Sequence, residues 1–428
     1  MRQPNNQHIG GTNMKKLFIT LLITLLAFAA NAQKSSVSGT VVNGQTGHPI
    51  AGANVSAVGE NIAVVTNSDG YFTLKTDQAP KGIRVSHVGF QTHVIHPTAE
   101  GLAGDLVIRL RPAAIMLKEV VVTNENARRL VENAISKIPD NYSTHPELLK
   151  GFYRETAMKR QHFIYVAEGV IDMYKTSYTR QAYQDRVAIR KGRRLLSPRQ
   201  GDTLGVKVMG GPVQPIQLDI AKNRDFLLNN EDLDCYAFSM ASPQSIDGRL
   251  QHVVRMEPSA NMPYALYHGL LYIDQETLAF TRAELSLDMS DKDKATRYML
   301  IKKPLGVKFK PKEMSLLIDY KQDNGVTRIS YIRNVFKFNC DWKRRLLATS
   351  FTATCEMVVT DVQTSNSTNG KDGDSTVHPI KGRDSFDSRD MFFDKVEYFK
   401  DPHFWEDYNI IEPTESLDKA INRLLKRF

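Results

Sequence analysis

His403 and Glu406 have the spacing at which two side chains can share one metal ion. This His-x-x-Glu pair is part of a ligand set for catalytic zinc, which takes three protein ligands and leaves one position open. The remaining ligand would be a second histidine further along the chain, but no histidine follows His403. The sequence therefore predicts no metal site here, and it favours packing of Phe404 and Trp405 against a sheet.

The patterns of common hydrolases are also missing from the sequence. H-E-x-x-H, G-x-S-x-G and the P-loop do not occur. Ser416 and Lys419 have S-x-x-K spacing, but the other parts of that active site are absent. A glycosidase needs only two carboxylates at the right separation, which a sequence does not reveal. We predict a protein without catalytic residues, metal or cofactor, and an unrecognised hydrolase stays an alternative.

The most strongly biased stretch runs from residue 180 to residue 199, with seven cationic side chains and one acid. One interpretation is a solvated, mobile basic loop, in which water and salt separate the like charges. The other is a binding surface for anions such as lipid phosphates, because arginine matches phosphate with two parallel donors. For that function we predict these binding residues: Arg186, Arg190, Lys191, Arg193 and Arg194.

Three cysteines, Cys235, Cys340 and Cys355, are too few for a disulfide-based scaffold of this size. One disulfide with any of three pairings is open, and no C-x-x-C suggests zinc. We favour the interpretation that all three are small buried apolar side chains.

Residues 1–32 have the pattern of a cleaved secretory signal. Met14-Lys15-Lys16 precedes fourteen uncharged residues, which end at the small residues of Ala30-Asn31-Ala32. As a helix this run would rise about 21 Å, short of the roughly 30 Å hydrocarbon core, so we favour a signal over an anchor. No cysteine stands near the cleavage point to be acylated, and translation could start at Met14.

Composition is that of a globular protein, with 428 residues of which 41% are hydrophobic. Removing residues 1–32 takes away three cations and no acid, so the net charge of +9 becomes +6. No later run reaches 18 apolar residues, which predicts no transmembrane span in the mature chain. A mildly basic, exported protein is not expected to bind nucleic acid.

Residues 33–112 contain seven short β-branched or alternating runs separated by Gly, Pro, Asn and Asp turns, as in a β-sandwich. The runs are 37–42, 54–58, 62–66, 71–75, 83–87, 91–95 and 105–110. Asn67-Ser68-Asp69-Gly70 predicts a tight turn in which Gly70 takes a positive φ.

This segment resembles the carboxypeptidase regulatory-like domain, a transthyretin-like sandwich also found at the front of TonB-dependent receptors. The resemblance rests on Ser38-Gly39-Thr40-Val41-Val42, Thr46-Gly47-His48-Pro49-Ile50, Ala51-Gly52-Ala53-Asn54-Val55 and Thr66-Asn67-Ser68-Asp69-Gly70-Tyr71-Phe72. Leu117-Lys118-Glu119-Val120-Val121-Val122-Thr123 is similar to the segment that joins this domain to the receptor plug. The resemblance implies a structural domain without catalytic residues, and the rest of the chain lacks the many strands of a receptor barrel.

Residues 113–149 form the predicted linker. Within it, residues 124–138 have one apolar face and read as an amphipathic helix that Pro139 ends. We expect this helix to be a hinge between the domains or a lid on the second.

Residues 150–362 predict one antiparallel sheet. An Asn324-Gly325 turn would pair Ile318 with Tyr331 and Tyr320 with Ile329, leaving Asp319, Lys321, Arg328 and Ser330 on a wet or ligand-facing side. Residues 269–280 predict a second hairpin. Long hairpins beside a helix resemble the open half-barrel of lipoprotein-sorting proteins.

Residues 363–390 are polar and without hydrophobic period, and predict a mobile loop. Residues 391–428 come next as a C-terminal segment with a helix carrying Leu417, Ile421, Leu424 and Leu425. With Gly151-Phe152-Tyr153-Arg154-Glu155 and Met209-Gly210-Gly211-Pro212, this ending is similar to uncharacterised exported proteins that pair the regulatory-like domain with a β-rich domain.

The predicted fold is mainly β: a transthyretin-like sandwich, a linking helix, an antiparallel half-barrel-like sheet and a short C-terminal helix. The predicted function is a non-enzymatic binding or scaffold protein of the cell envelope, in the periplasm or at the outer membrane. Its expected partner is an envelope protein or an anionic lipid or glycan surface. The alternative is a lipid or lipoprotein carrier. A carrier needs an apolar concave lining, whereas a scaffold needs a filled core and an exposed patch.

Overall fold

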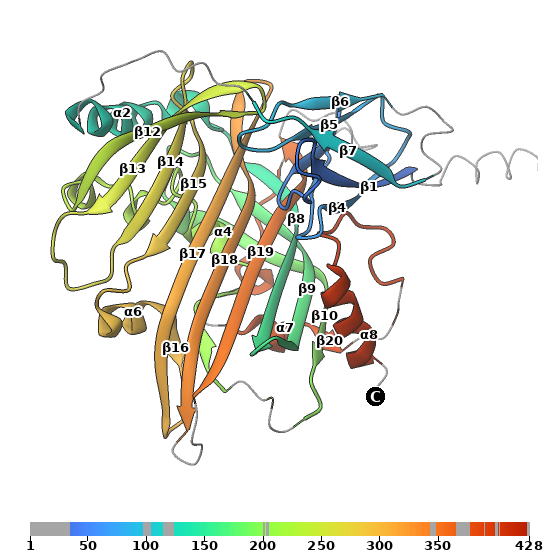
Figure 1. Ribbon diagram of the computed structural model, residues 1–428, viewed down its shortest axis with the longest axis vertical. Helices are drawn as coiled ribbons and strands as arrows, with labels where there is room; N and C mark the ends of the chain where they lie inside the picture. Colours follow the sequence, from blue (N-terminus) through green and yellow to red (C-terminus); the bar gives the residue numbers. More distant parts are fainter. Residues whose placement is uncertain are drawn as a thin grey trace, which may run out of the picture.

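Short alternating runs near the N-terminus form two small sheets that pack face to face in the computed structural model (Figure 1). The structure describes residues 35–96, 104–113, 124–199, 202, 205–342, 348–364, 377–388, 390–398, 401 and 403–425. The sheet of order β4-β1-β7 contains β1 (Ser35–Asn43), β4 (Tyr71–Thr76) and β7 (Leu106–Leu110). The other, of order β3-β2-β5-β6, contains β2 (Asn54–Ala57), β3 (Ala63–Val65), β5 (Ile83–Ser86) and β6 (His93–Ile95). All seven predicted strands are confirmed to within two residues.

The Asn67–Gly70 turn has the predicted conformation. The Asn67 side chain accepts hydrogen bonds from the backbone N–H groups of Asp69 and Tyr71, both at 2.9 Å. Gly70 has φ +75°, and a Cβ there would lie 2.5 Å from the Val41 carbonyl oxygen. Glycine is therefore required for both its conformation and its size.

The second domain is built on one open, eleven-stranded sheet of order β12-β13-β14-β15-β17-β18-β19-β8-β9-β10-β20. All neighbours are antiparallel except β10 and β20. The strands are β8 (Glu147–Lys159), β9 (His162–Lys175), β10 (Arg186–Leu196), β12 (Tyr236–Ile246), β13 (Arg249–Pro258), β14 (Tyr267–Asp274), β15 (Phe280–Leu287), β17 (Val307–Asp323), β18 (Val326–Trp342), β19 (Thr349–Thr364) and β20 (Glu397–Tyr398). A separate pair joins β11 (Lys207–Val208) to β16 (Leu300–Lys302). The prediction of one large antiparallel sheet is confirmed.

The β17–β18 hairpin differs from its prediction by one residue on one strand. Asn324 and Gly325 both have positive φ, and Tyr320 pairs with Ile329 as predicted. A bulge then shifts the register, so Tyr331 pairs with Asp319 and not with Ile318. One extra residue moves the following side chains to the opposite face. Tyr331 accordingly packs beside Phe152 and Trp405, away from Ile318.

We call the side of the sheet that carries Tyr153, Ile171 and Ile318 the inner face. The chain between β11 and β12 covers it with α4 (Gln214–Gln217), η3 (Arg224–Phe226) and α5 (Asn230–Leu233), and buries Ile216, Leu228 and Leu233 there. The helices α3 (Ile138–Asn141) and α6 (Lys292–Met299) add Ile138 and Met299 to the same core.

The predicted linking helix is α2 (Asn124–Ser136), which packs against β12 in Figure 1. Val131, Ala134 and Ile135 join the inner-face core, so the helix is part of the second domain and the hinge interpretation is wrong. Pro139 does not end it, because α2 stops at Ser136 and Pro139 lies in the first turn of α3.

The opposite, outer face carries the sandwich and the C-terminal segment. Val65 of β3 packs with Phe152, Val358 and Trp405. The final helix α8 (Glu415–Leu425) packs Leu417, Ile421 and Leu424 on Val166 and Leu195, which confirms the predicted apolar face.

The predicted mobile loop needs correction where it is described. The short helix η1 (Ala182–Gln184) precedes β10. Within residues 377–388, η4 (Gly382–Asp384) leads to Phe386, which is buried and donates its N–H to the Val187 carbonyl of β10 at 2.7 Å. Its ring approaches that of Phe392 in α7 (Phe392–Lys395), so this half is packed because it carries apolar anchors. Residues 365–376 and the signal prediction for 1–32 lie outside the described residues. No helix in the described part of the chain is long and apolar enough to cross a membrane.

Candidate ligand-binding pocket

The inner face is left unfilled at one end of β8, β9 and β19. Ala157 on β8 pairs with Ala353 on β19 and with Tyr165 on β9. Two adjacent alanines leave room that larger side chains occupy elsewhere on the sheet. Glu155 and Cys355, the next inward-facing pair, complete the floor.

Two segments from other parts of the chain form the walls. One is residues 206–211, which include β11, and the other is residues 390–393 at the start of α7. The two segments meet where Lys207 donates to the Asp390 carbonyl at 3.2 Å. The Phe392 ring packs edge-on against Tyr153 at 5.1 Å between centroids. The pocket has a volume of about 340 Å³, and its surface is mostly apolar. Leu196 and Met391 line it while remaining 38% and 42% exposed, so they stand at the rim.

Glu155 is the polar centre of the pocket. Its carboxylate accepts hydrogen bonds from the hydroxyls of Tyr153, at 2.9 Å, and Tyr165. Burial raises the pKa of Glu155 even though both hydroxyls and the charge of Lys207 favour the ionised form. Both hydrogen-bond donors to the Glu155 carboxylate are neutral hydroxyls. Burial of the site disfavours the negative charge of Glu155.

The other polar groups of the pocket offer little reactivity. Burial raises the pKa of the Cys355 thiol to about 12, so the thiol is uncharged and a poor nucleophile at neutral pH. Asp202 is 2.9 Å from Lys159, and Asp390 is 3.1 Å from Lys395. No histidine lines the pocket among the described residues. The arrangement suits binding better than acid–base or nucleophilic catalysis.

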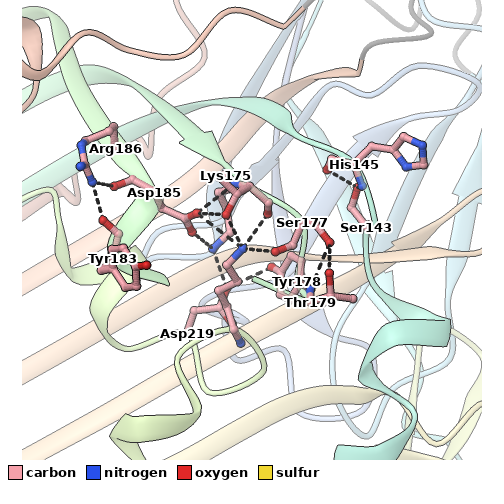
Figure 2. Close-up of polar contacts among 12 residues, drawn as sticks. Ser143, His145, Lys175, Ser177, Tyr178, Thr179, Tyr183, Asp185, Arg186 and Asp219 are labelled. Atoms are coloured by element: carbon pink, nitrogen blue, oxygen red, sulfur yellow. Dashed lines mark hydrogen bonds and ion pairs between the residues drawn. The ribbon is translucent and has the colours of Figure 1, made fainter. Parts of the chain in front are cut away.

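A buried charge network lies elsewhere on the inner face, at the end of β9 (Figure 2). Asp219 accepts hydrogen bonds from Lys175 at 2.7 Å and from the hydroxyls of Tyr178 and Tyr320 at 3.0 and 2.8 Å. Lys222 lies 3.5 Å from Asp185 and donates to the Thr176 carbonyl at 2.6 Å.

Two lysines and two aspartates make this network neutral overall. Burial lowers the pKa of Lys222 to about 8, although Asp185 and Asp219 favour its charged form. Because its members bond one another, the network attaches the segment carrying Asp219 and Lys222 to β9. We assign it a structural function.

The predicted anion-binding residues lie on or beside strand β10, so the mobile-loop interpretation is wrong. Each makes a hydrogen bond within the chain: Arg186 with the Tyr183 carbonyl, Arg190 with Asp172, Lys191 with the Phe404 carbonyl, Arg193 with Glu168 and Arg194 with the Phe393 carbonyl. The like charges are separated by aromatic rings and acids of neighbouring elements. An anion would compete with these partners, and anion binding here stays a prediction.

The His403–Glu406 pair is exposed, with 3.4 Å between the ring Nδ1 and the carboxylate. No group of three potential metal ligands occurs among the described residues. The packing interpretation is confirmed, because the Trp405 ring is buried against Phe152 and its N–H donates to Glu168 at 2.9 Å. The three cysteines are free and buried, as favoured.

Sequence reasoning missed the pocket. Its floor joins Glu155 to Cys355, two hundred residues apart, and only the pairing of β8 with β19 brings them together. The Gly210-Gly211 pair in the wall is the one sequence signal for close packing at this site. A Cβ on Gly211 would lie 3.1 Å from the Phe386 ring. The predicted wet side of β17 and β18, with Asp319, Lys321 and Ser330, instead faces the sandwich.

Comparison with known proteins identifies the first domain. A family model for the CarboxypepD_reg-like domain matches residues 37–122, in agreement with the predicted resemblance. No curated protein matches the chain.

Solved structures that match the chain include three bacterial proteins. A Vibrio parahaemolyticus domain assigned to outer membrane lipoprotein sorting is 9% identical over 59% of this chain and 97% of its own, with a TM-score of 0.26. A DUF1329 family protein from Desulfovibrio piger is 10% identical over 55% and 92%, with a TM-score of 0.22. A LolA superfamily protein from Nitrosomonas europaea is 12% identical over 55% and 94%, with a TM-score of 0.18.

Proposed function

We propose that this protein is an exported, non-enzymatic binding protein of the cell envelope, and that the pocket holds one small, mostly apolar ligand. The observation that carries the proposal is the mostly apolar cavity of about 340 Å³ on the inner face of the sheet. Ligand pockets span roughly 300–1,000 Å³, so this one suits a single short chain or ring system. A carrier of several long acyl chains would need a larger opening.

Export is supported by the sequence of residues 14–32, with its cationic start, apolar run and small residues before Gln33. The regulatory-like domain supports a non-catalytic role for the N-terminal part. It packs on the outer face through Val65 and leaves the pocket on the other side of the sheet.

Glu155 sets the preferred head group of the ligand. A carboxylate that receives two hydroxyl donors has capacity for a further donor. An amine or hydroxyl at the end of an apolar body would therefore suit the pocket better than a carboxylate, which Glu155 would repel.

The test uses N-phenylnaphthylamine, a fluorescent apolar probe, displaced by dodecylamine, dodecanol or dodecanoate. These three compounds share one chain and differ in the head group. We expect the amine and the alcohol to displace the probe at lower concentration than the carboxylate.

Two matched variants locate the binding. Leu196→Trp fills the rim of the pocket, whereas Leu250→Trp alters a leucine of similar exposure on β13. We expect Leu196→Trp to weaken probe binding about tenfold or more, which corresponds to about 1.4 kcal/mol, and Leu250→Trp to leave it unchanged. Equal effects of both variants, or no probe binding by the parent protein, would contradict the pocket proposal. The scaffold hypothesis would then stand, with partner contacts through the sandwich edges at Val94 and Val107.

A further inference from the structure

Strand β16 and the turn that joins it to β17 expose two large aliphatic side chains. Leu305 is fully exposed, at 103%, and Ile301 is 53% exposed. Leu305 has the largest exposed fraction of the nine large hydrophobic side chains that are exposed in the described part of the chain. A single exposed leucine is ordinary, but two large aliphatic side chains within five residues form an apolar surface that is unfavourable in water.

Cations surround these two residues. Residues 300–312 contain five lysines and no acid: Lys302, Lys303, Lys308, Lys310 and Lys312. All five are exposed, while Val307 and Phe309 between them point into the core. We call residues 300–312 the basic tip. Of its lysines, Lys310 forms an ion pair with Asp341 at 2.5 Å, and Lys303 donates to the Val307 carbonyl at 2.8 Å.

The basic tip is held in place by the rest of the fold. β16 pairs with β11, so Lys302 lies opposite Lys207. Pro304 stands so close to Gly205 that a Cβ there would be 2.7 Å from the proline ring. In Figure 1 the ends of β17 and β18 extend beyond the sheet at the bottom, away from the sandwich. The tip is therefore a fixed projection at the end of the long hairpin.

The pocket and the basic tip share one end of the molecule. Lys207 and Val208 of β11 line the pocket and pair with β16. The pocket rim carries Leu196 and Met391, two more of the nine exposed hydrophobic side chains. Four of the nine thus lie at the pocket rim or on the adjacent tip.

We propose that the basic tip docks the protein on an anionic lipid bilayer. Ile301 and Leu305 enter the boundary between headgroups and acyl chains, and the lysines contact lipid phosphates. Exposed aliphatic residues flanked by lysines have the composition of interfacial membrane anchors, in which apolar burial and charge attraction add together. Docking in this orientation places the pocket mouth near the membrane. The proposal does not depend on the pocket holding a ligand.

The experiment is flotation of the mature, full chain with vesicles of phosphatidylcholine alone or mixed equally with phosphatidylglycerol, at low and high salt. We expect binding to the anionic vesicles only, weakened by salt. Trp342 pairs with Val307 at the base of the tip, and the only other tryptophan, Trp405, is buried on the outer face. Binding should therefore shift the emission of Trp342 to shorter wavelength.

Variants separate the tip from the rest of the surface. Ile301→Ser with Leu305→Ser should weaken binding roughly tenfold or more. Lys302→Ser with Lys308→Ser should weaken it roughly 25-fold, at about fivefold for each cation near the surface. Leu250→Ser, on β13, is the apolar control and should have no effect.

Arg190→Ser tests the rival surface, because the Arg190 side chain is 59% exposed on β10. A loss with Arg190→Ser and none with the tip variants would overturn the proposal in favour of β10. Equal binding to neutral and anionic vesicles, or no flotation at all, would overturn it as well. Circular dichroism of each variant shows whether a loss reflects unfolding.

Discussion

At the scale of single residues, Glu168 joins three elements on the outer face. Its carboxylate accepts hydrogen bonds from Arg154 on β8 and Arg193 on β10, both at 2.7 Å, and from the Trp405 ring at 2.9 Å. Burial by itself would raise the pKa of Glu168, but the two guanidinium groups outweigh burial and lower the pKa to about 2. Arg193 of the basic stretch is thus paired with a buried acid inside the fold.

Glu168 should make the protein sensitive to acid. Its folded pKa lies below its ordinary value of 4.5, so its stabilising contribution is present above about pH 4.5 and is lost as the pH falls towards 2. The pKa difference corresponds to about 3 kcal/mol. We expect Glu168→Gln to lower the unfolding free energy by about this amount at pH 7 and to match the parent protein near pH 2. Urea unfolding across this range measures the gap, and a gap that stays constant with pH would contradict the assignment.

At the scale of elements, two turns of the sandwich require glycine, one for its backbone conformation and the other also for its small size. Gly47 and Gly70 have nearly the same φ, +72° and +75°. A Cβ on Gly47 would meet nothing within 4 Å, whereas a Cβ on Gly70 would lie 2.5 Å from the Val41 carbonyl oxygen. The first position needs glycine for its backbone conformation alone, and the second needs it for space as well.

We expect Gly47→Ala to cost about 1–2 kcal/mol of stability, the strain of a left-handed alanine. Gly70→Ala should cost clearly more, because β1 must also move away from the new methyl group. Thermal unfolding of the two variants gives the comparison. Equal costs would mean that the β1–β4 region relaxes without penalty.

At the scale of the whole molecule, the C-terminal segment fastens the sandwich to the sheet. Lys75 on β4 donates to the carbonyls of Trp405 and Tyr408, at 2.9 and 3.1 Å. Asn409 bonds the Lys75 backbone in both directions at 2.8 Å, and Asn67 donates to the Pro413 carbonyl at 2.9 Å. The two domains are therefore coupled through residues that are more than 300 positions apart.

We expect a fragment of residues 33–112 to fold alone, because its thirteen-residue buried core is contained within it. Circular dichroism of the fragment should show β structure. A random-coil fragment would show that the sandwich depends on the sheet.

In the full chain, Asn409→Ala with Lys75→Ala should remove the hydrogen bonds that these two residues share and split one thermal transition into two. Thr73→Ala, a change at another partly buried β4 position, serves as the control.

Much of the local structure follows from short-range patterns in the sequence. The seven strands, the Asn67–Gly70 turn and the Asn324-Gly325 hairpin arise from alternation and turn chemistry, which act over a few residues. The pocket and the charge pairing depend on tertiary contacts, because strand pairing joins segments that are distant in the sequence. Pairing of β8 with β19 created the pocket beside Glu155, and β9 and the C-terminal segment supplied partners for the cations of β10. One bulge at Ser330 moved Tyr331 to the outer face, away from Ile318. Tertiary neighbours decide which charged side chains are paired and which faces of the sheet are covered. Residue spacing in the sequence does not reveal these neighbours.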